Sequence, residues 1–159
     1  MRRVVITGLG IVSPLGCGVS NNWESLISGK SGISKITKFD VSDIAAKIAG
    51  IVPRGDEIGK FNPNSLLSPK EQRKLSDFII YALSASADAV KDAGIDDQNS
   101  FTPERTGVII GSGIGGLDKI EETTLMMQEK GAKRVSPFFI PASLINLASG
   151  QVSIKHGFR

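Results

Sequence analysis

Apolar residues along the chain form short continuous runs in some places and stripes spaced by three or four in others. The runs Arg3–Ile6 and Thr106–Gly111 lead into glycine turns, and we predict a buried strand for each. Stripes within Ser68–Ala93, Leu117–Lys130 and Ser143–His156 predict helices, because side chains three and four positions apart share one helix face. The pattern therefore predicts both strands and helices in one chain.

Shorter elements are expected between the strands and helices just named. Asn21 with Glu24 three residues later matches a capping box, which predicts a short helix that ends at Gly29. Residues 34–51 have scattered apolar positions and predict short strands and loops. Residues 54–67 are rich in glycine, proline and asparagine, so a loop is expected there.

The clearest helix start is at Ser68, which suits the N-cap, with Pro69 at the first helical position and Glu71 at the third. At about 100° per residue, three cations gather on the face opposite the apolar stripe of this helix. Positive charge near a helix start opposes the helix dipole. We interpret the cluster as either a solvated face or a docking patch for an acidic partner. The three cations are Lys70, Arg73 and Lys74.

A glycine cluster, Gly111–Gly116, joins the second predicted strand to the helix Leu117–Lys130. Its spacing satisfies the G-x-G-x-x-G pattern of dinucleotide-binding folds, which also requires a second strand ending in an acidic residue. The segment Gly131–Pro137 is basic and broken by proline instead. A tight turn without a ligand is one alternative, and a turn that floors a pocket for an apolar substrate, with Ile114 inside it, is another.

Two prolines bracket the apolar residues of Ser136–Pro141, and we expect an extended segment that is not an interior strand. Phe138 and Phe139 within it are expected to insert into a core, a pocket or a partner, because exposed phenylalanines favour association. The following helix, Ser143–His156, is apolar or small nearly all round, with one charge at Lys155. Such a pattern predicts a helix buried on every side.

Composition narrows the function classes. The 159 residues are 40% apolar and 22% charged, as in an ordinary soluble globular domain. A net charge of +3 is too small to indicate nucleic-acid binding, although it permits an acidic partner. No segment approaches the roughly 20 continuous apolar residues of a membrane span. One cysteine, Cys17, excludes an internal disulfide and fits a reducing compartment, so a cytoplasmic location is expected.

The single cysteine and the single histidine are the obvious candidates for nucleophilic chemistry. Cys17 follows the first predicted strand, where nothing nearby in sequence would lower its pKa. His156 ends a helix, where a histidine can simply interact with the negative end of the dipole. A Cys17–His156 dyad would require the fold to bring two distant segments together.

Several of these motifs, taken together and in order, resemble the 3-oxoacyl-[acyl-carrier-protein] synthases, and the type II enzymes most of all. The resemblance covers essentially residues 1–159, as the N-terminal portion of one domain. It implies an α/β, thiolase-like fold, of which this chain would form the N-terminal part of the first βαβαβαββ half. The motifs that carry it are Val4–Gly10 with Ser13–Gly16, Ser68–Lys74, Gly111–Gly116 and Ser136–Pro141.

The resemblance implies fatty acid chain elongation, by acyl transfer to a cysteine and decarboxylative condensation with malonyl-[acyl-carrier protein]. It implies a homodimer and neither a cofactor nor a metal. Ile114 would line the acyl pocket, and Phe139, beside Phe138, would reach into the pocket of the neighbouring subunit. The residues that would dock the acidic acyl carrier protein are Lys70, Arg73, Lys74, Lys133 and Arg134.

In the family, the nucleophilic cysteine lies in a Thr-Ala-Cys motif a few residues beyond the position of Arg159, and two histidines and a lysine follow. We therefore expect no catalytic residue among these 159, and no activity of the chain alone. Two other interpretations stay open: a dinucleotide-binding domain, and a non-catalytic partner such as a chain-length factor or a gene remnant.

Overall fold

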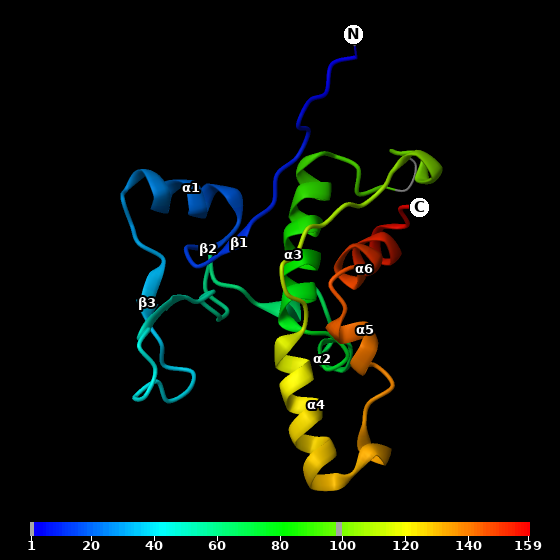
Figure 1. Ribbon diagram of the computed structural model, residues 1–159. Coiled ribbons are helices and arrows are strands. Elements are labelled where there is room, and N and C mark those ends of the chain that lie inside the picture. The colour runs from blue at the N-terminus through cyan, green and yellow to red at the C-terminus, as the bar shows by residue number, and fades with distance from the viewer. Residues whose placement is uncertain (1, 98–99) are drawn as a thin grey trace.

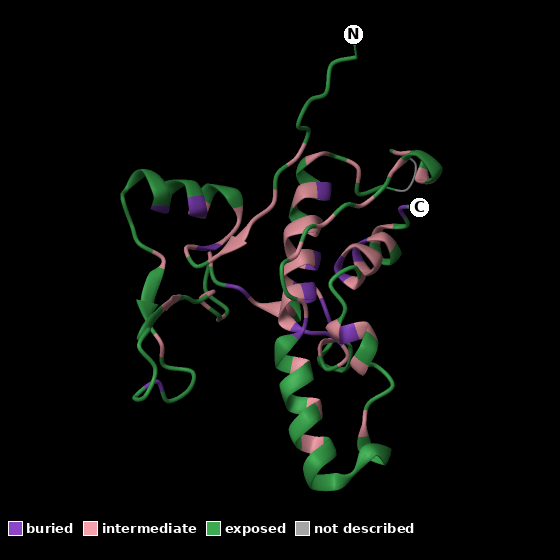
Figure 2. Cartoon of the chain, viewed as in Figure 1, coloured by how far each residue is buried: buried purple, intermediate pink, exposed green. Residues whose placement is uncertain are grey.

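The computed structural model describes residues 2–97 and 100–159, and helix α3, Asp77–Asp92, lies at its centre (Figure 1). Helix α6, Leu147–His156, packs against α3. The hydrophobic core lies between the two and is closed by residues from the loops before α3. Figure 2 shows the buried residues concentrated here. The buried core residues are Phe61, Leu67, Leu75, Ile79, Ile80, Leu83, Ala148 and Val152.

Short elements surround this helix pair. Helix α1 and the β3–β4 pair lie on one side of α3, and α2, α4 and α5 gather at its N-terminal end (Figure 1). Both strand pairs are antiparallel, with Val12 opposite Cys17 in the first and Ile33 opposite Gly50 in the second. The remaining elements are β1 Val12–Ser13, β2 Gly16–Cys17, α1 Val19–Ile27, β3 Ile33–Lys35, β4 Ile48–Gly50, η1 Pro63–Ser65, α2 Pro69–Gln72, η2 Pro103–Arg105, α4 Leu117–Lys130, η3 Ala132–Arg134 and α5 Phe139–Ser143.

The strands predicted at Arg3–Ile6 and Thr106–Gly111 are not formed, although both segments are described. The second segment has the alternating burial of a strand, since Val108 and Ile110 pack on the core and Ile109 is fully exposed. Neither segment has a paired neighbour in the described residues. A strand is defined by hydrogen bonds to another strand, so apolar sequence alone does not form one.

The predicted capping box at Asn21 is also wrong, because the N-cap of α1 is Gly18, three residues earlier. The Asn21 side chain donates instead to the carbonyl of Leu15, at 3.1 Å. The Asn21 side chain therefore stabilises the β1–β2 turn and does not cap the helix. Termination near Gly29 is confirmed, with Gly29 at φ +69. Residues 34–51 contain short strands, as predicted, and 54–67 are largely loop.

The helix predicted over Ser68–Ala93 is two helices, α2 and α3, with a break between them. Ser76 is extended and buried at the start of α3, and its hydroxyl donates to the carboxylate of Asp118 on α4. The break turns Leu75 into the core. Gly94, just past the end of α3, adopts φ +67, the left-handed conformation with which glycine commonly ends a helix.

Helix α4 has the predicted bounds, but its apolar residues do not face inward. Leu117, Ile120 and Met127 are 57%, 40% and 47% exposed. Figure 2 shows α4 projecting from the core with most of its surface exposed. The spacing of apolar residues predicted that one face of α4 is buried, but no other segment of the described residues covers that face.

Residues 136–141 are not extended as predicted, because α5 begins at Phe139. Pro141 is tolerated in the first turn of this helix, where a backbone N–H has no intrahelical partner. Helix α6 begins at Leu147, and only Ala148 and Val152 are buried in it, whereas Ile154 is 76% exposed. The expectation of a helix buried on every side is therefore wrong. Among the described residues, no helix has the length and apolarity that crossing a membrane requires.

Candidate functional site

The candidate site begins at helix α2, whose start is set by a capping box. The Ser68 N–H donates to Glu71 Oε2 at 2.8 Å, and the Glu71 N–H donates to Ser68 Oγ at 3.4 Å. The Ser68 hydroxyl also donates to Glu71 Oε2, at 2.6 Å, and this bond together with that from the Ser68 N–H lowers the pKa of Glu71. Pro69 occupies the first turn, where it loses no hydrogen bond. The capping box and Pro69 together fix the start of α2, and so they position Lys70, Arg73 and Lys74, which follow Pro69.

The basic residues predicted to dock a partner lie at two places. Lys70 and Arg73 are exposed around α2, and Lys74 is half-buried with its Nζ 4.6 Å from the centroid of the Phe138 ring. Lys133 and Arg134 are exposed in η3, beyond the far end of α4 (Figure 1). The structure thus places Lys74 beside Phe138, in the proline-bracketed segment. Lys133 and Arg134 lie at the other end of the connection between α4 and α5.

The glycine turn packs against α5. The N–H of Gly116 donates to the Ser143 carbonyl at 3.0 Å. A Cβ on Gly115 would lie 2.1 Å from the same oxygen, and one on Gly116 would lie 2.5 Å from the Ala142 carbonyl. Close backbone approach explains these two glycines. Gly111 has open space around it and φ outside the left-handed region.

The two predicted acyl-pocket residues lie on these neighbouring elements. Phe139, at the start of α5, lines a small cavity of about 70 Å³ together with Arg73, Lys74 and Met126. Ile114 is 65% exposed in the glycine turn and does not line that cavity. The structure therefore brings the two elements together through the Gly116–Ser143 hydrogen bond, but the two side chains do not share a closed pocket.

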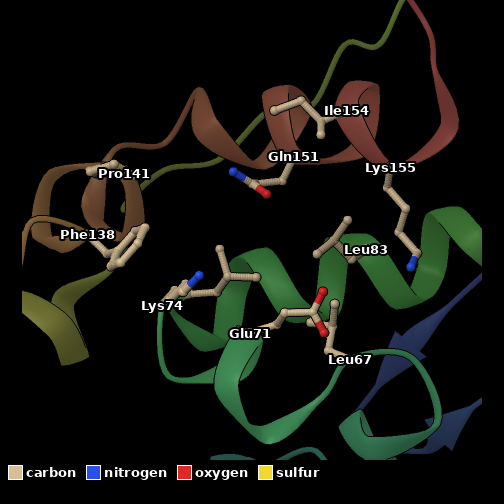
Figure 3. A pocket seen from close by; sticks show the side chains of 10 residues that line it. Leu67, Glu71, Lys74, Leu83, Phe138, Pro141, Gln151, Ile154 and Lys155 are labelled. Carbon is tan, nitrogen blue, oxygen red and sulfur yellow. The ribbon is translucent and has the colours of Figure 1, made fainter.

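A larger cavity, which the sequence pattern did not predict, lies between α2, α3, α5 and α6 (Figure 3). Its volume is about 330 Å³. Lysines enter it from two sides, Lys74 and Lys155, with Glu71 between them (Figure 3). Lys155 was visible in the sequence as the one charge on an apolar helix, but four separate segments make the cavity and no local pattern reveals it.

Cys17 and His156 do not meet. Cys17 is half-buried in β2, on the α1 side of α3, whereas His156 ends α6 and stacks on Phe158 at 5.5 Å between ring centroids (Figure 1). Burial raises the pKa of Cys17, and the carboxylate of Asp88 raises it further. The thiol is therefore poorly suited to act as a nucleophile. Within residues 2–97 and 100–159, no group of three or more histidine, cysteine or acidic side chains could hold a metal ion.

Comparison with known proteins gives consistent matches. The model of the family described as "Beta-ketoacyl synthase, N-terminal domain" matches residues 1–159. The 3-oxoacyl-[acyl-carrier-protein] synthase 2 of Rhizobium meliloti (strain 1021) is 51% identical over 160 residues, covering 100% of this chain and 38% of that protein. The protein of the same name from Coxiella burnetii (strain RSA 493 / Nine Mile phase I) is 44% identical over 158 residues, covering 99% and 36%.

A solved structure agrees with these matches. The ishigamide ketosynthase/chain length factor superposes with a TM-score of 0.80 at 26% sequence identity, and the match covers 99% of this chain and 38% of that one. The chain therefore spans 36% to 38% of the length of these proteins.

Proposed function

Because the chain belongs to the beta-ketoacyl synthase family, we propose that it contributes the N-terminal part of a 3-oxoacyl-[acyl-carrier-protein] synthase of type II. Its fold is the thiolase-like α/β fold of the ketosynthases, as predicted. The most similar of the relatives named above are 3-oxoacyl-[acyl-carrier-protein] synthases, which are acyltransferases of fatty acid synthesis. The proposed reaction is transfer of an acyl group to a cysteine, followed by decarboxylative condensation with malonyl-[acyl-carrier protein] in the cytoplasm.

Under this proposal the chain supplies binding surfaces and no catalytic group. Condensation needs a thiolate nucleophile and donors that stabilise the charge developing as carbon dioxide leaves. The raised pKa of Cys17 and its separation from His156 argue against either residue in these roles. The nucleophile is assigned to a part of the protein beyond these residues, and the isolated chain is expected to be inactive.

The first binding surface is the basic one. Lys70 and Arg73 at α2, with Lys133 and Arg134 in η3, are exposed and free to meet an acidic carrier protein. Each surface ion pair contributes little, but a cluster of like charges steers the encounter and makes it sensitive to salt. Lys74 contributes at the edge of this surface, beside Phe138.

The second binding surface is apolar. The Gly116–Ser143 hydrogen bond holds the turn that carries Ile114 against the helix that carries Phe139. We assign both side chains to an acyl pocket. Exposed apolar residues Ile140, Leu144 and Ile145 adjoin it, and they support a homodimer whose partner subunit covers this region.

The match of the whole chain to synthases at 51% and 44% identity carries the proposal. Its test is binding of acyl carrier protein by the protein with Lys70→Glu and Arg73→Glu. Since exposed pairs contribute about 0.2–1 kcal/mol each, we expect about tenfold weaker binding at low salt and a smaller difference at high salt. Surface plasmon resonance at two salt concentrations measures this. Lys30→Glu with Lys91→Glu is the matched control, and equal affinity of the two double variants would contradict the docking surface.

A non-catalytic partner is the second candidate, because the superposed structure is a ketosynthase together with a chain length factor. Formation of an acyl-enzyme distinguishes the synthase from the non-catalytic partner. A synthase accumulates the acyl-enzyme when it is mixed with acylated acyl carrier protein, whereas a chain-length factor does not. The dinucleotide-binding interpretation loses support, since Gly115 and Gly116 pack on α5 and the described residues 106–111 just before the turn form no strand. Saturable micromolar binding of NAD(H) would restore it.

A further inference from the structure

The cavity of Figure 3 has apolar walls contributed by helices α3, α5 and α6 and by the residues that flank α2 and α5. At about 330 Å³, its volume is at the lower end of the range found for small-molecule sites. The side chains come from segments that are far apart in the sequence. The apolar walls are formed by Leu67, Leu75, Leu83, Phe138, Pro141 and Ile154.

Charge in this cavity is unbalanced. The carboxylate of Glu71 is already bound by the Ser68 N–H and hydroxyl, at 2.8 and 2.6 Å. Lys155 and Lys74 both lower the pKa of Glu71, which places the three charges in one neighbourhood. Yet neither lysine has a carboxylate within 4.0 Å in the described part of the chain. Lys74, Lys155 and Glu71 together give the cavity a net charge of +1, and the carboxylate of Glu71 already accepts hydrogen bonds from Ser68.

Gln151 adds a polar group between the two lysines. Its amide points from α6 toward the cavity (Figure 3), and its side chain makes no hydrogen bond to the described residues. An amide N–H and two ammonium groups are donors suited to a carboxylate. The surrounding leucines, Phe138 and Ile154 suit a hydrocarbon chain attached to it.

We propose that this cavity binds a medium-chain fatty carboxylate, with the carboxylate between Lys74 and Lys155 and the hydrocarbon chain along the apolar walls. This site is separate from the acyl pocket assigned to Ile114 and Phe139, neither of which lines it. Lys74 also belongs to the proposed docking surface. If that surface is correct, the carboxylate and the acyl carrier protein compete for Lys74, so that a free fatty acid inhibits docking.

Isothermal titration calorimetry of the protein with octanoate, below its micelle concentration, tests the site. Affinity is expected to rise about fourfold per methylene from butanoate to octanoate. Octanol, which lacks the charge, is expected to bind about tenfold more weakly than octanoate. Equal binding of octanol and octanoate, or no saturable octanoate binding, would overturn the proposal.

Two exposed positions provide the variants. Lys155→Gln should weaken octanoate binding about tenfold, whereas Lys30→Gln, an equal loss of charge beyond α1, should leave it unchanged. Ile154→Asn should flatten the dependence on chain length. Both lining residues are largely exposed, so circular dichroism should report an unchanged helix content. Equal octanoate affinity of the Lys155 and Lys30 variants would overturn the assignment.

The competition has a separate readout. Octanoate should weaken binding of acyl carrier protein to the unmodified protein, and should have little effect on the Lys155→Gln variant, which retains Lys74. If octanoate binds but does not weaken binding of acyl carrier protein, the cavity site is supported and the proposed competition for Lys74 is contradicted. Loss of carrier binding in the Lys70 and Arg73 variant, with octanoate affinity unchanged, would show that the two sites are distinct.

Discussion

At the scale of single residues, His156 shows how burial outweighs the helix dipole. A histidine at a helix C-terminus is favoured in its charged form. Here Nε2 is buried without a hydrogen-bond partner in the described residues, and burial, then Lys155, lowers the pKa of His156. The imidazole therefore stacks on Phe158 in its neutral form.

A pH dependence of stability follows from this lowered pKa. Between the folded pKa and the ordinary value of about 6.5, the unfolded chain binds more protons, so stability rises with pH across that window. It falls as the pH drops from about 6.5 through the folded pKa. His156→Phe keeps the stacking and should remove this part of the pH dependence. Urea unfolding at several pH values between 5 and 7.5 measures it, and identical slopes for the two proteins would contradict the prediction.

Ile114 carries the prediction about acyl length. Replacing Ile114 with Phe in an active synthase would reduce the space at the glycine turn, and such overpacking costs about 1–3 kcal/mol. Long acyl chains should therefore lose activity more than short ones. Elongation rates with carriers of increasing acyl length measure this. A loss that does not depend on acyl length would contradict a role of Ile114 in the acyl pocket.

At the scale of elements, helix α2 depends on its cap because it is only four residues long. Ser68→Ala removes the acceptor for the Glu71 N–H and the hydroxyl that donates to its carboxylate. We expect a loss of about 0.5–2 kcal/mol in the free energy of unfolding. Chemical denaturation measures it, with Ser20→Ala on the exposed side of α1 as control. Equal stability of the two variants would mean that the capping box contributes nothing.

At the scale of the whole molecule, the N-terminal segment is held against α3 by close backbone contact. A Cβ on Gly10 would lie 1.9 Å from the Ala85 carbonyl, whereas one on Gly107 would meet nothing within 4 Å. Gly10→Ala should therefore displace the segment and lower the thermal midpoint. Gly107→Ala, at a residue without positive φ, should leave the midpoint unchanged or raise it slightly. A Gly10→Ala protein as stable as the Gly107→Ala protein would show that the contact is not required.

The features that the sequence determined by itself are local ones. The capping box at Ser68, the left-handed glycines Gly29 and Gly94 and the bounds of α4 all follow from residues within a few positions of each other. Motif order along residues 1–159 also identified the family, which the matches bear out. These features need no knowledge of what packs against them, because the interacting groups are close along the chain.

Tertiary structure alone decided the rest. The break before α3 depends on Ser76 meeting Asp118, 42 positions away, and the cavity of Figure 3 depends on four helices converging. The two predicted strands stayed unpaired and the apolar face of α4 stayed exposed for the same reason. Strand pairing and burial both require a second segment to pair or pack with. The pattern along one segment shows that such a partner is required, but it does not show which segment is the partner.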